Sequence, residues 1–223
     1  MSAAGLSTEV VRELFESEVA ECGGSVVHIF IDELRLFARA VLPDLEEVKP
    51  GDAFQGGVAV RQVGDDVFVH PYLLRKLCTN GAVMPTSFPG TKFAETSRSA
   101  CMQIRAAIRR MCNLEAVRGS LIQVKSTLDQ RPDALMMLSE MVQTASEVHR
   151  PYMLKVFERF VKAGDTTPFG FMNAITSVAR DTVEPEDRWR LEELGGSIGA
   201  KIRRPDPTDE LRARRRVTAG AIC

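Results

Sequence analysis

Residues 56–74 read GGVAVRQVGDDVFVHPYLL, and this stretch decides how the first half of the chain folds. Two valine-rich runs flank Gly64-Asp65-Asp66, and glycine and aspartate are residues that tight turns favour. Because valine and aromatic residues favour strands, the stretch predicts an antiparallel hairpin. Pro71 has no amide hydrogen to donate, so we expect the second strand to end there or to lie there at a sheet edge.

The residues before this hairpin predict a helix followed by further strands. Ser7 can cap a segment over residues 7–20 in which apolar side chains recur at helical spacing. Residues 25–42 are rich in β-branched and aromatic side chains and predict one or two strands, whereas residues 43–52 have the composition of a loop.

From Ser97 onward the apolar residues follow a helical period. We expect Gly195-Gly196 to stop the last helix and residues 203–223 to form a basic disordered tail, since they are charged and hold little apolar content. Strands in front and helices behind predict an α+β fold, with a strand-rich part over 1–97 and a helical part over 98–202 in a single domain. The segments with helical spacing are residues 97–117, 133–148, 151–163, 169–180 and 185–195.

Residues 74–84, LRKLCTNGAVM, allow a catalytic and a structural interpretation. A nucleophilic cysteine needs a base, and the nearest histidine, His70, is separated from Cys78 by a proline. Asn80-Gly81 between apolar runs instead favours a tight turn with Cys78 packed inward. The sequence therefore predicts no catalytic residue, and an enzyme using Cys78 ranks third among the possible functions.

Composition predicts a cytoplasmic protein without a membrane segment, metal or other cofactor. The 223 residues are 44% hydrophobic, and no run approaches the roughly 18 apolar residues of a membrane span. The N-terminal stretch is acidic and amphipathic, which is unlike a secretion signal. Five cysteines without a CxxC pair indicate reduced thiols, and the three scattered histidines do not have the short spacing of zinc ligands.

The net charge of −1 conceals an asymmetry between the two halves. Residues 1–97 carry 8 Lys+Arg and 14 Asp+Glu, whereas residues 98–223 carry 21 and 16. Such polarity indicates either an anionic partner for the second half or a contact between unlike halves, within one chain or between subunits. A contact of this kind between subunits predicts a homo-oligomer.

The helix that opens at Ser97 is the candidate binding surface. Arg98, Arg105 and Arg109 fall within about 20° on a helical wheel, opposite an apolar stripe. Residues 98–125 contain six Lys+Arg and one acid, so like charges repel along this face unless phosphates or acids from elsewhere in the fold compensate them. The predicted nucleic-acid-binding residues are Arg98, Arg105, Arg109, Arg110 and Lys125.

Parts of the chain resemble a family of phage/plasmid-like proteins that carry a domain of unknown function. In that family a GxxVRNS-like strand, a second strand and an LxRLVCTNG-like segment follow in order, and residues 54–84 are similar, most closely at Cys78-Thr79-Asn80-Gly81. Residues 173–196 resemble the family's C-terminal helix pair, but QVGDD stands after Arg61 where the family has Asn-Ser. The resemblance implies a mobile-element context and no particular reaction. The order of elements is also similar to that of single-strand annealing proteins.

Two functions are therefore expected. The first is a non-enzymatic nucleic-acid-binding protein of a phage- or plasmid-type element, a single-strand annealing protein or a recombination accessory, with exposed aromatic side chains of the strand-rich part stacking on bases. The second is a structural or interaction protein, an assembly or host-modulating factor whose basic helix is paired with acids.

Overall fold

The computed structural model describes residues 6–84, 91–92, 97–128, 130 and 149–201, and it has the α+β fold that the sequence predicts. The predicted helix over 133–148 and the predicted tail over 203–223 lie outside these described residues. In chain order the elements are α1 (Thr8–Glu21), β1 (Ser25–Ile31), β2 (Arg35–Lys49), β3 (Asp52–Val63), β4 (Asp66–Arg75), β5 (Asn80–Val83), β6 (Thr91–Lys92), α2 (Ser97–Met111), α3 (Leu114–Ser126), α5 (Arg150–Ala163), α6 (Pro168–Arg180) and α7 (Pro185–Lys201).

The strands form one antiparallel sheet in the order β1-β2-β3-β4-β5, with the short β6 paired to the start of β4. The predicted hairpin is confirmed as β3 and β4, where Val63 pairs with Asp66 across the turn. Gly64 has φ 58° in that turn, a conformation that glycine adopts without the steric cost of a side chain. From β1 to β5 the meander places each strand next to its neighbour in sequence, so short connections suffice.

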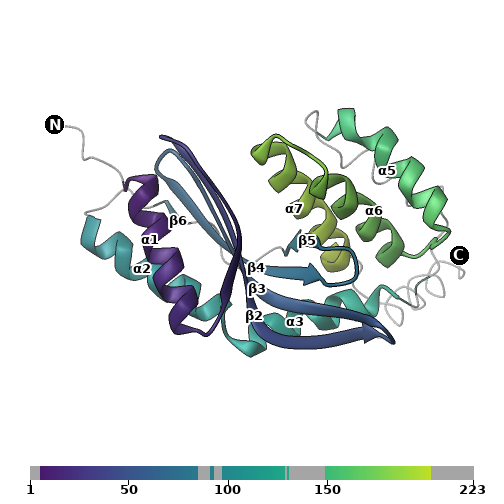
Figure 1. Ribbon diagram of the computed structural model, residues 1–223, viewed down its shortest axis with the longest axis horizontal. Coiled ribbons are helices and arrows are strands. Elements are labelled where there is room, and N and C mark those ends of the chain that lie inside the picture. The colour runs from purple at the N-terminus through teal and green to yellow at the C-terminus, as the bar shows by residue number, and fades with distance from the viewer. Residues whose placement is uncertain (1–5, 85–90, 93–96, 129, 131–148, 202–223) are drawn as a thin grey trace, which may run out of the picture.

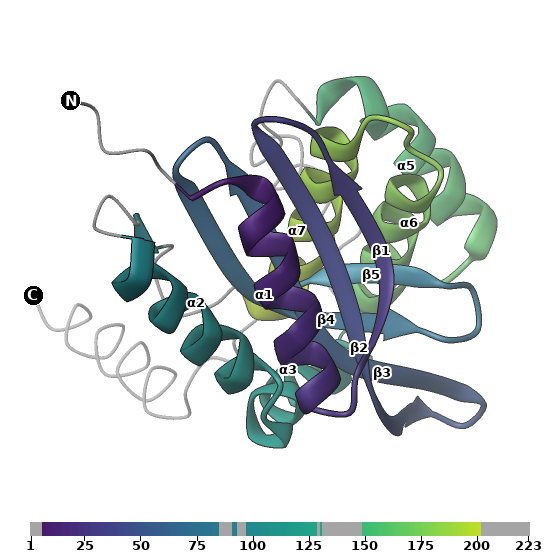
Figure 2. The ribbon, with the colours of Figure 1, turned by 60° about the vertical axis from the view of Figure 1, so that its left-hand side comes forward.

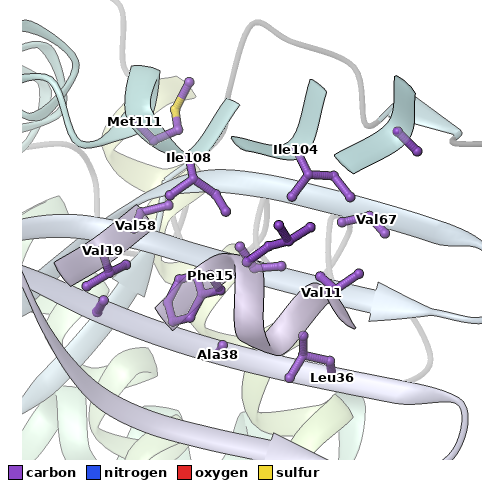
Figure 3. Close-up of a cluster of buried hydrophobic side chains, with 14 residues drawn as sticks. Val11, Phe15, Val19, Leu36, Ala38, Val58, Val67, Ile104, Ile108 and Met111 are labelled. Carbon is purple, nitrogen blue, oxygen red and sulfur yellow. The ribbon is translucent and has the colours of Figure 1, made fainter. Parts of the chain in front are cut away.

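Helices cover the two faces of the sheet. On one face, α1 and α2 lie side by side over the strands (Figures 1 and 2). Between them and the sheet lies an apolar core to which Phe15 contributes from α1 and Ile104 from α2, both fully buried (Figure 3). The helices α5, α6 and α7 stand on the other side (Figure 1). Trp189 of α7 is fully buried there, with its ring centroid 5.8 Å from that of Phe37.

The predicted loop over residues 43–52 is wrong, because β2 continues to Lys49. The pairing of β2 with β3 shifts register between Val41 and Leu45, so Pro43 lies at an irregularity of the ladder, where a residue without an amide hydrogen is tolerated. Of the two alternatives for Pro71, the end of the strand is wrong, because β4 continues to Arg75. Pro71 instead lies just outside the ladder with β5, which begins at the pair Tyr72–Val83. The Pro71 carbonyl accepts a hydrogen bond from Met84 N (2.9 Å). In an antiparallel pair the nitrogen of a residue faces the same way as its carbonyl, so the proline nitrogen, which has no hydrogen to donate, faces the chain just beyond the end of β5.

The α7 helix also continues where a break is predicted, passing through Gly195-Gly196 to Lys201. A Cβ atom at Gly196 would lie 2.1 Å from the carbonyl oxygen of Val83 in β5, and one at Gly195 would lie 2.6 Å from Cγ2 of Thr176 in α6. The two glycines therefore allow α7 to pass close to the backbone of β5 and to α6, rather than ending the helix.

Candidate functional site

The arginines predicted to bind nucleic acid lie on the outer face of α2. Arg98, Arg105, Arg109 and Arg110 are all exposed. The opposite stripe of the helix packs into the core, as the helical wheel predicts, and its buried residues are Ala100, Ile104, Ile108 and Met111. The helical wheel therefore places Arg98, Arg105 and Arg109 correctly on the exposed side of α2.

Two of these arginines contact acids of the neighbouring helix α1. Arg109 Nε donates a hydrogen bond to Glu18, and its Nη2 lies 2.7 Å from Glu21 Oε2. Arg105 Nη1 lies 3.5 Å from the other carboxylate oxygen of Glu18. The side chain of Glu18 is fully buried, whereas those of Arg105 and Arg109 are 47% and 54% exposed. Acids of the strand-rich half thus relieve the repulsion between the two arginines.

The remaining predicted residues have different surroundings. Lys125 lies on α3, where its Nζ is 3.4 Å from Glu46 Oε2 of β2, and Arg118 shares the same carboxylate at 3.9 Å. Arg98 makes no ion pair with any described residue. The structure therefore places the predicted residues on two consecutive helices rather than on one.

Sequence reasoning missed Glu18, although its position carries a signal. Val11, Leu14 and Phe15 form the buried stripe of α1, and Glu18 continues this stripe at helical spacing. An acidic side chain in an apolar stripe needs a cation or several hydrogen bonds, because a buried, unpaired carboxylate is costly. That requirement could have indicated a basic partner from another element.

The Cys78-Thr79-Asn80-Gly81 segment forms a hairpin, but the turn is shifted from the predicted place. The turn occupies residues 76–79, and Asn80 and Gly81 already belong to β5. Thr79 has φ 53°, an uncommon conformation for a β-branched residue. Gly81 is required for another reason, since a Cβ atom there would lie 1.9 Å from Tyr72 Oη.

This hairpin forms one wall of a cavity of about 470 Å³ whose opposite wall comes from α5 and α6. Cys78 is half-buried at this cavity rather than packed into the apolar core, which corrects the prediction for its side chain. Its sulfur lies 3.4 Å from Arg75 Nη1. The described residues around the cavity include no histidine that could act as a base for this thiol.

Basic side chains surround the cavity and share their acidic partners. The buried carboxylate of Asp52 accepts two hydrogen bonds from Arg75, at 2.6 and 2.7 Å, and also lies 4.0 Å from Lys49 Nζ. Asp181 is shared by Arg159, at 2.7 Å, and Arg180, at 2.9 Å. Each of these two carboxylates pairs with two cations, so these two clusters together carry a net positive charge.

Two of the aromatic side chains considered for stacking on bases are buried and unavailable. Phe54 and Tyr72 are each 2% exposed and pack in the core. Phe68 is half-buried, with the Arg61 guanidinium 5.6 Å from its ring centroid. Phe88 and Phe93 lie outside the described residues.

Comparisons of the chain with protein-family models, with curated proteins and with solved structures find no match. Within the described ranges, no helix combines the length and hydrophobicity that crossing a bilayer requires. The same part of the chain contains no group of three or more His, Cys, Asp or Glu side chains placed to hold a metal ion. Any functional argument therefore depends on the surfaces described above.

Proposed function

We propose that this chain is a non-enzymatic nucleic-acid-binding protein of a phage- or plasmid-type element, acting as a single-strand annealing protein or a recombination accessory. One observation carries the proposal: four exposed basic side chains of α2 and α3 share three acidic partners, Glu18, Glu21 and Glu46, in the ion pairs of the described residues. These four are Arg105, Arg109, Arg118 and Lys125. Annealing needs no metal or nucleotide, because base pairing itself drives it.

The existing ion pairs are compatible with phosphate binding. A guanidinium group has five N–H donors, and a carboxylate on one side leaves donors on the other side free. Arg109 and Arg118 remain 54% and 66% exposed while paired. An arginine held by a buried carboxylate also loses less conformational entropy when it binds a phosphate.

A second function is favoured by a different observation. Glu18 is fully buried between Arg105 and Arg109, which makes this cluster a structural contact between α1 and α2. On that basis the chain would be an interaction protein, an assembly or host-modulating factor, and its basic helix would serve the fold. The self-association expected from the charge asymmetry belongs to either function and can be measured by light scattering.

Mobility-shift titrations of labelled single- and double-stranded DNA and RNA, at two salt concentrations, test the proposal. We expect salt-sensitive binding that is weakened in an Arg98→Ala/Arg118→Ala variant, whose melting temperature should stay near that of the wild type because both side chains are exposed. Each lost phosphate contact should reduce the salt slope by about 0.7 for a single strand or about 0.9 for a duplex.

Lys155→Ala provides the matched control, since Lys155 is an exposed cation on α5, far in sequence from the proposed surface. This variant should bind as the wild type does. Wild-type protein that binds neither DNA nor RNA at low salt would reject nucleic-acid binding and favour the interaction protein.

A further inference from the structure

The cavity between the β4–β5 hairpin and the helices α5 and α6 has the features of a ligand site that the proposed function does not use. Its volume of about 470 Å³ lies within the range of roughly 300–1,000 Å³ that small-molecule sites occupy. Its walls come from three separate parts of the chain: Lys49 lies on β2, Asn80 on β5 and Lys162 on α5. The cavity is thus a product of the tertiary fold.

An unsatisfied polar group lines the cavity. Asn80 is 5% exposed, and its Nδ2 donates a long hydrogen bond of 3.4 Å to the carbonyl of Asn173 in α6. Its Oδ1 is buried and has no hydrogen-bond partner among the residues that the structure describes. A buried acceptor without a donor is energetically unfavourable, so a hydroxyl or amine group of a ligand in the cavity would stabilise it.

The side chains that line the cavity carry a net positive charge. Among the described residues, four basic side chains line it, and Asp165 is the one lining acid. The basic side chains are those of Lys49, Arg75, Arg159 and Lys162. The Asp165 carboxylate accepts hydrogen bonds from the amide and the hydroxyl of Thr167, the N-cap residue of α6, so it is already engaged. Lys162 is exposed and makes no ion pair with the described residues, which leaves its ammonium group available to an anion.

The hairpin wall is held rigidly in place. Arg75 is fixed by the buried carboxylate of Asp52 and lies over the ring of Phe169, 5.6 Å from its centroid. Arg180 of α6 donates a hydrogen bond of 2.7 Å to the carbonyl of Cys78, which ties the turn to the helix. A preformed site of this kind loses little entropy on binding a ligand.

We propose that this cavity binds a phosphate monoester that carries hydroxyl or amine donors and is about the size of a mononucleotide. The phosphate contacts Lys162 and its basic neighbours, and a donor of the ligand contacts Asn80 Oδ1. The ligand is either a free small molecule or a terminal nucleotide of a strand. The proposal does not depend on the proposed function, because α5 and α6, which line the cavity, lie on the other side of the sheet from α2 (Figure 1).

Calorimetric titration of the full chain with AMP, ribose 5-phosphate, adenosine and inorganic phosphate tests this site. We expect saturable binding of AMP or ribose 5-phosphate, with adenosine and inorganic phosphate weaker by at least about tenfold. Lys162→Ala should weaken the phosphate ester by at least about fivefold. Lys155→Ala removes a lysine from the same helix outside the cavity and should leave the affinity unchanged.

A second variant tests the electrostatics of the cavity, because aspartate keeps an acceptor oxygen at position 80. Asn80→Asp places a negative charge in the cavity with almost no change in volume, so the phosphate ester should bind at least about tenfold more weakly. Arg98→Ala should have no effect, which separates this site from the face of α2. Competition by a 5′-phosphorylated oligonucleotide would identify a strand terminus as the ligand, and its absence would identify a free small molecule. The proposal is overturned if neither ester binds saturably at millimolar concentration, or if Lys162→Ala and Lys155→Ala weaken binding equally.

Discussion

At the scale of single residues, the fully buried ion pair between Arg39 of β2 and Glu192 of α7 joins the sheet to the helical half. Arg39 Nε donates to Glu192 at 2.6 Å, and both side chains are only 1% exposed. Arg188 supplies a second cation to the same carboxylate at 3.1 Å, and the Arg39 guanidinium lies 5.2 Å from the ring centroid of Trp189. Hydrogen bonds and aromatic contact thus compensate much of the desolvation that such a pair suffers.

Removal of one partner of this pair should be costly. In Arg39→Met the Glu192 carboxylate stays buried with Arg188 alone, so we expect the free energy of unfolding to fall by about 3–5 kcal/mol. Urea unfolding measures this loss. The double variant Arg39→Met/Glu192→Leu removes both charges and should recover a large part of the stability. A double variant less stable than Arg39→Met would contradict the explanation that an unpaired buried charge causes the loss.

At the scale of elements, local sequence signals correctly predict the helices and strands that have one face in solvent. The α1 helix begins at Thr8 with the Ser7 side chain accepting a hydrogen bond from Val10 N, as its capping serine predicts. The β3–β4 hairpin follows its turn residues. In both cases the deciding interactions lie within a few residues of one another, and a single sequence contains them.

The sequence predictions are wrong where contacts between residues distant in sequence determine the local structure. Pro43 remains within β2 because the ladder with β3 shifts register around it, and no local pattern predicts that shift. The Asn80-Gly81 pair resembles a turn, but Gly81 is needed in β5 because the Tyr72 hydroxyl occupies the space of a side chain. The arginines of the candidate site were placed on the surface correctly, whereas their pairing with Glu18 depends on how α1 and α2 pack.

Two glycines in helices allow a direct test of whether local propensity or a distant contact determines the choice of residue. In Gly196→Ala the new methyl group would overlap the Val83 carbonyl, so we expect a loss of about 1–3 kcal/mol as α7 shifts from β5. Gly119 of α3 is the matched control, because a Cβ atom there meets nothing within 4 Å. Gly119→Ala should stabilise the protein by about 0.5–1 kcal/mol through helix propensity. Thermal melting measures both variants. If their melting temperatures shifted in the same direction, the close approach of α7 to β5 would not explain the effect of Gly196→Ala.

At the scale of the whole molecule, the charge asymmetry of the sequence corresponds to contacts between its two halves. Acids of the strand-rich half pair with cations of the helical half at Glu18 with Arg109 and at Glu46 with Lys125. Pairs of the opposite polarity, such as Arg61 with Glu186 at 2.5 Å, also cross between the halves. The asymmetry therefore has an intramolecular role, and it does not require a partner by itself.

The three histidines make acid stability a property of the whole fold. Burial lowers the pKa of His28 and of His70 to about 4, with nearby Arg39 and Arg61 respectively acting in the same direction, and burial also lowers the pKa of His149. In the unfolded chain these groups titrate near their ordinary value of 6.5. The unfolded chain therefore binds more protons than the folded chain between about pH 6.5 and 4.

Because protons favour the unfolded chain in that window, stability should be full above about pH 6.5 and fall as the pH drops towards 4. We expect a loss on the order of 2 kcal/mol, discounted because the histidines are partly solvated. Glu193 lies 3.9 Å from His70, and burial raises its pKa. Because the folded chain then binds a proton at Glu193 more readily than the unfolded chain, this one group works against the loss of stability at low pH. Urea unfolding at pH 7.5, 6.0 and 5.0 measures the slope, and His28→Gln/His70→Gln should flatten it. An equally steep slope in that variant would assign the acid sensitivity to the carboxylates of the ion pairs instead.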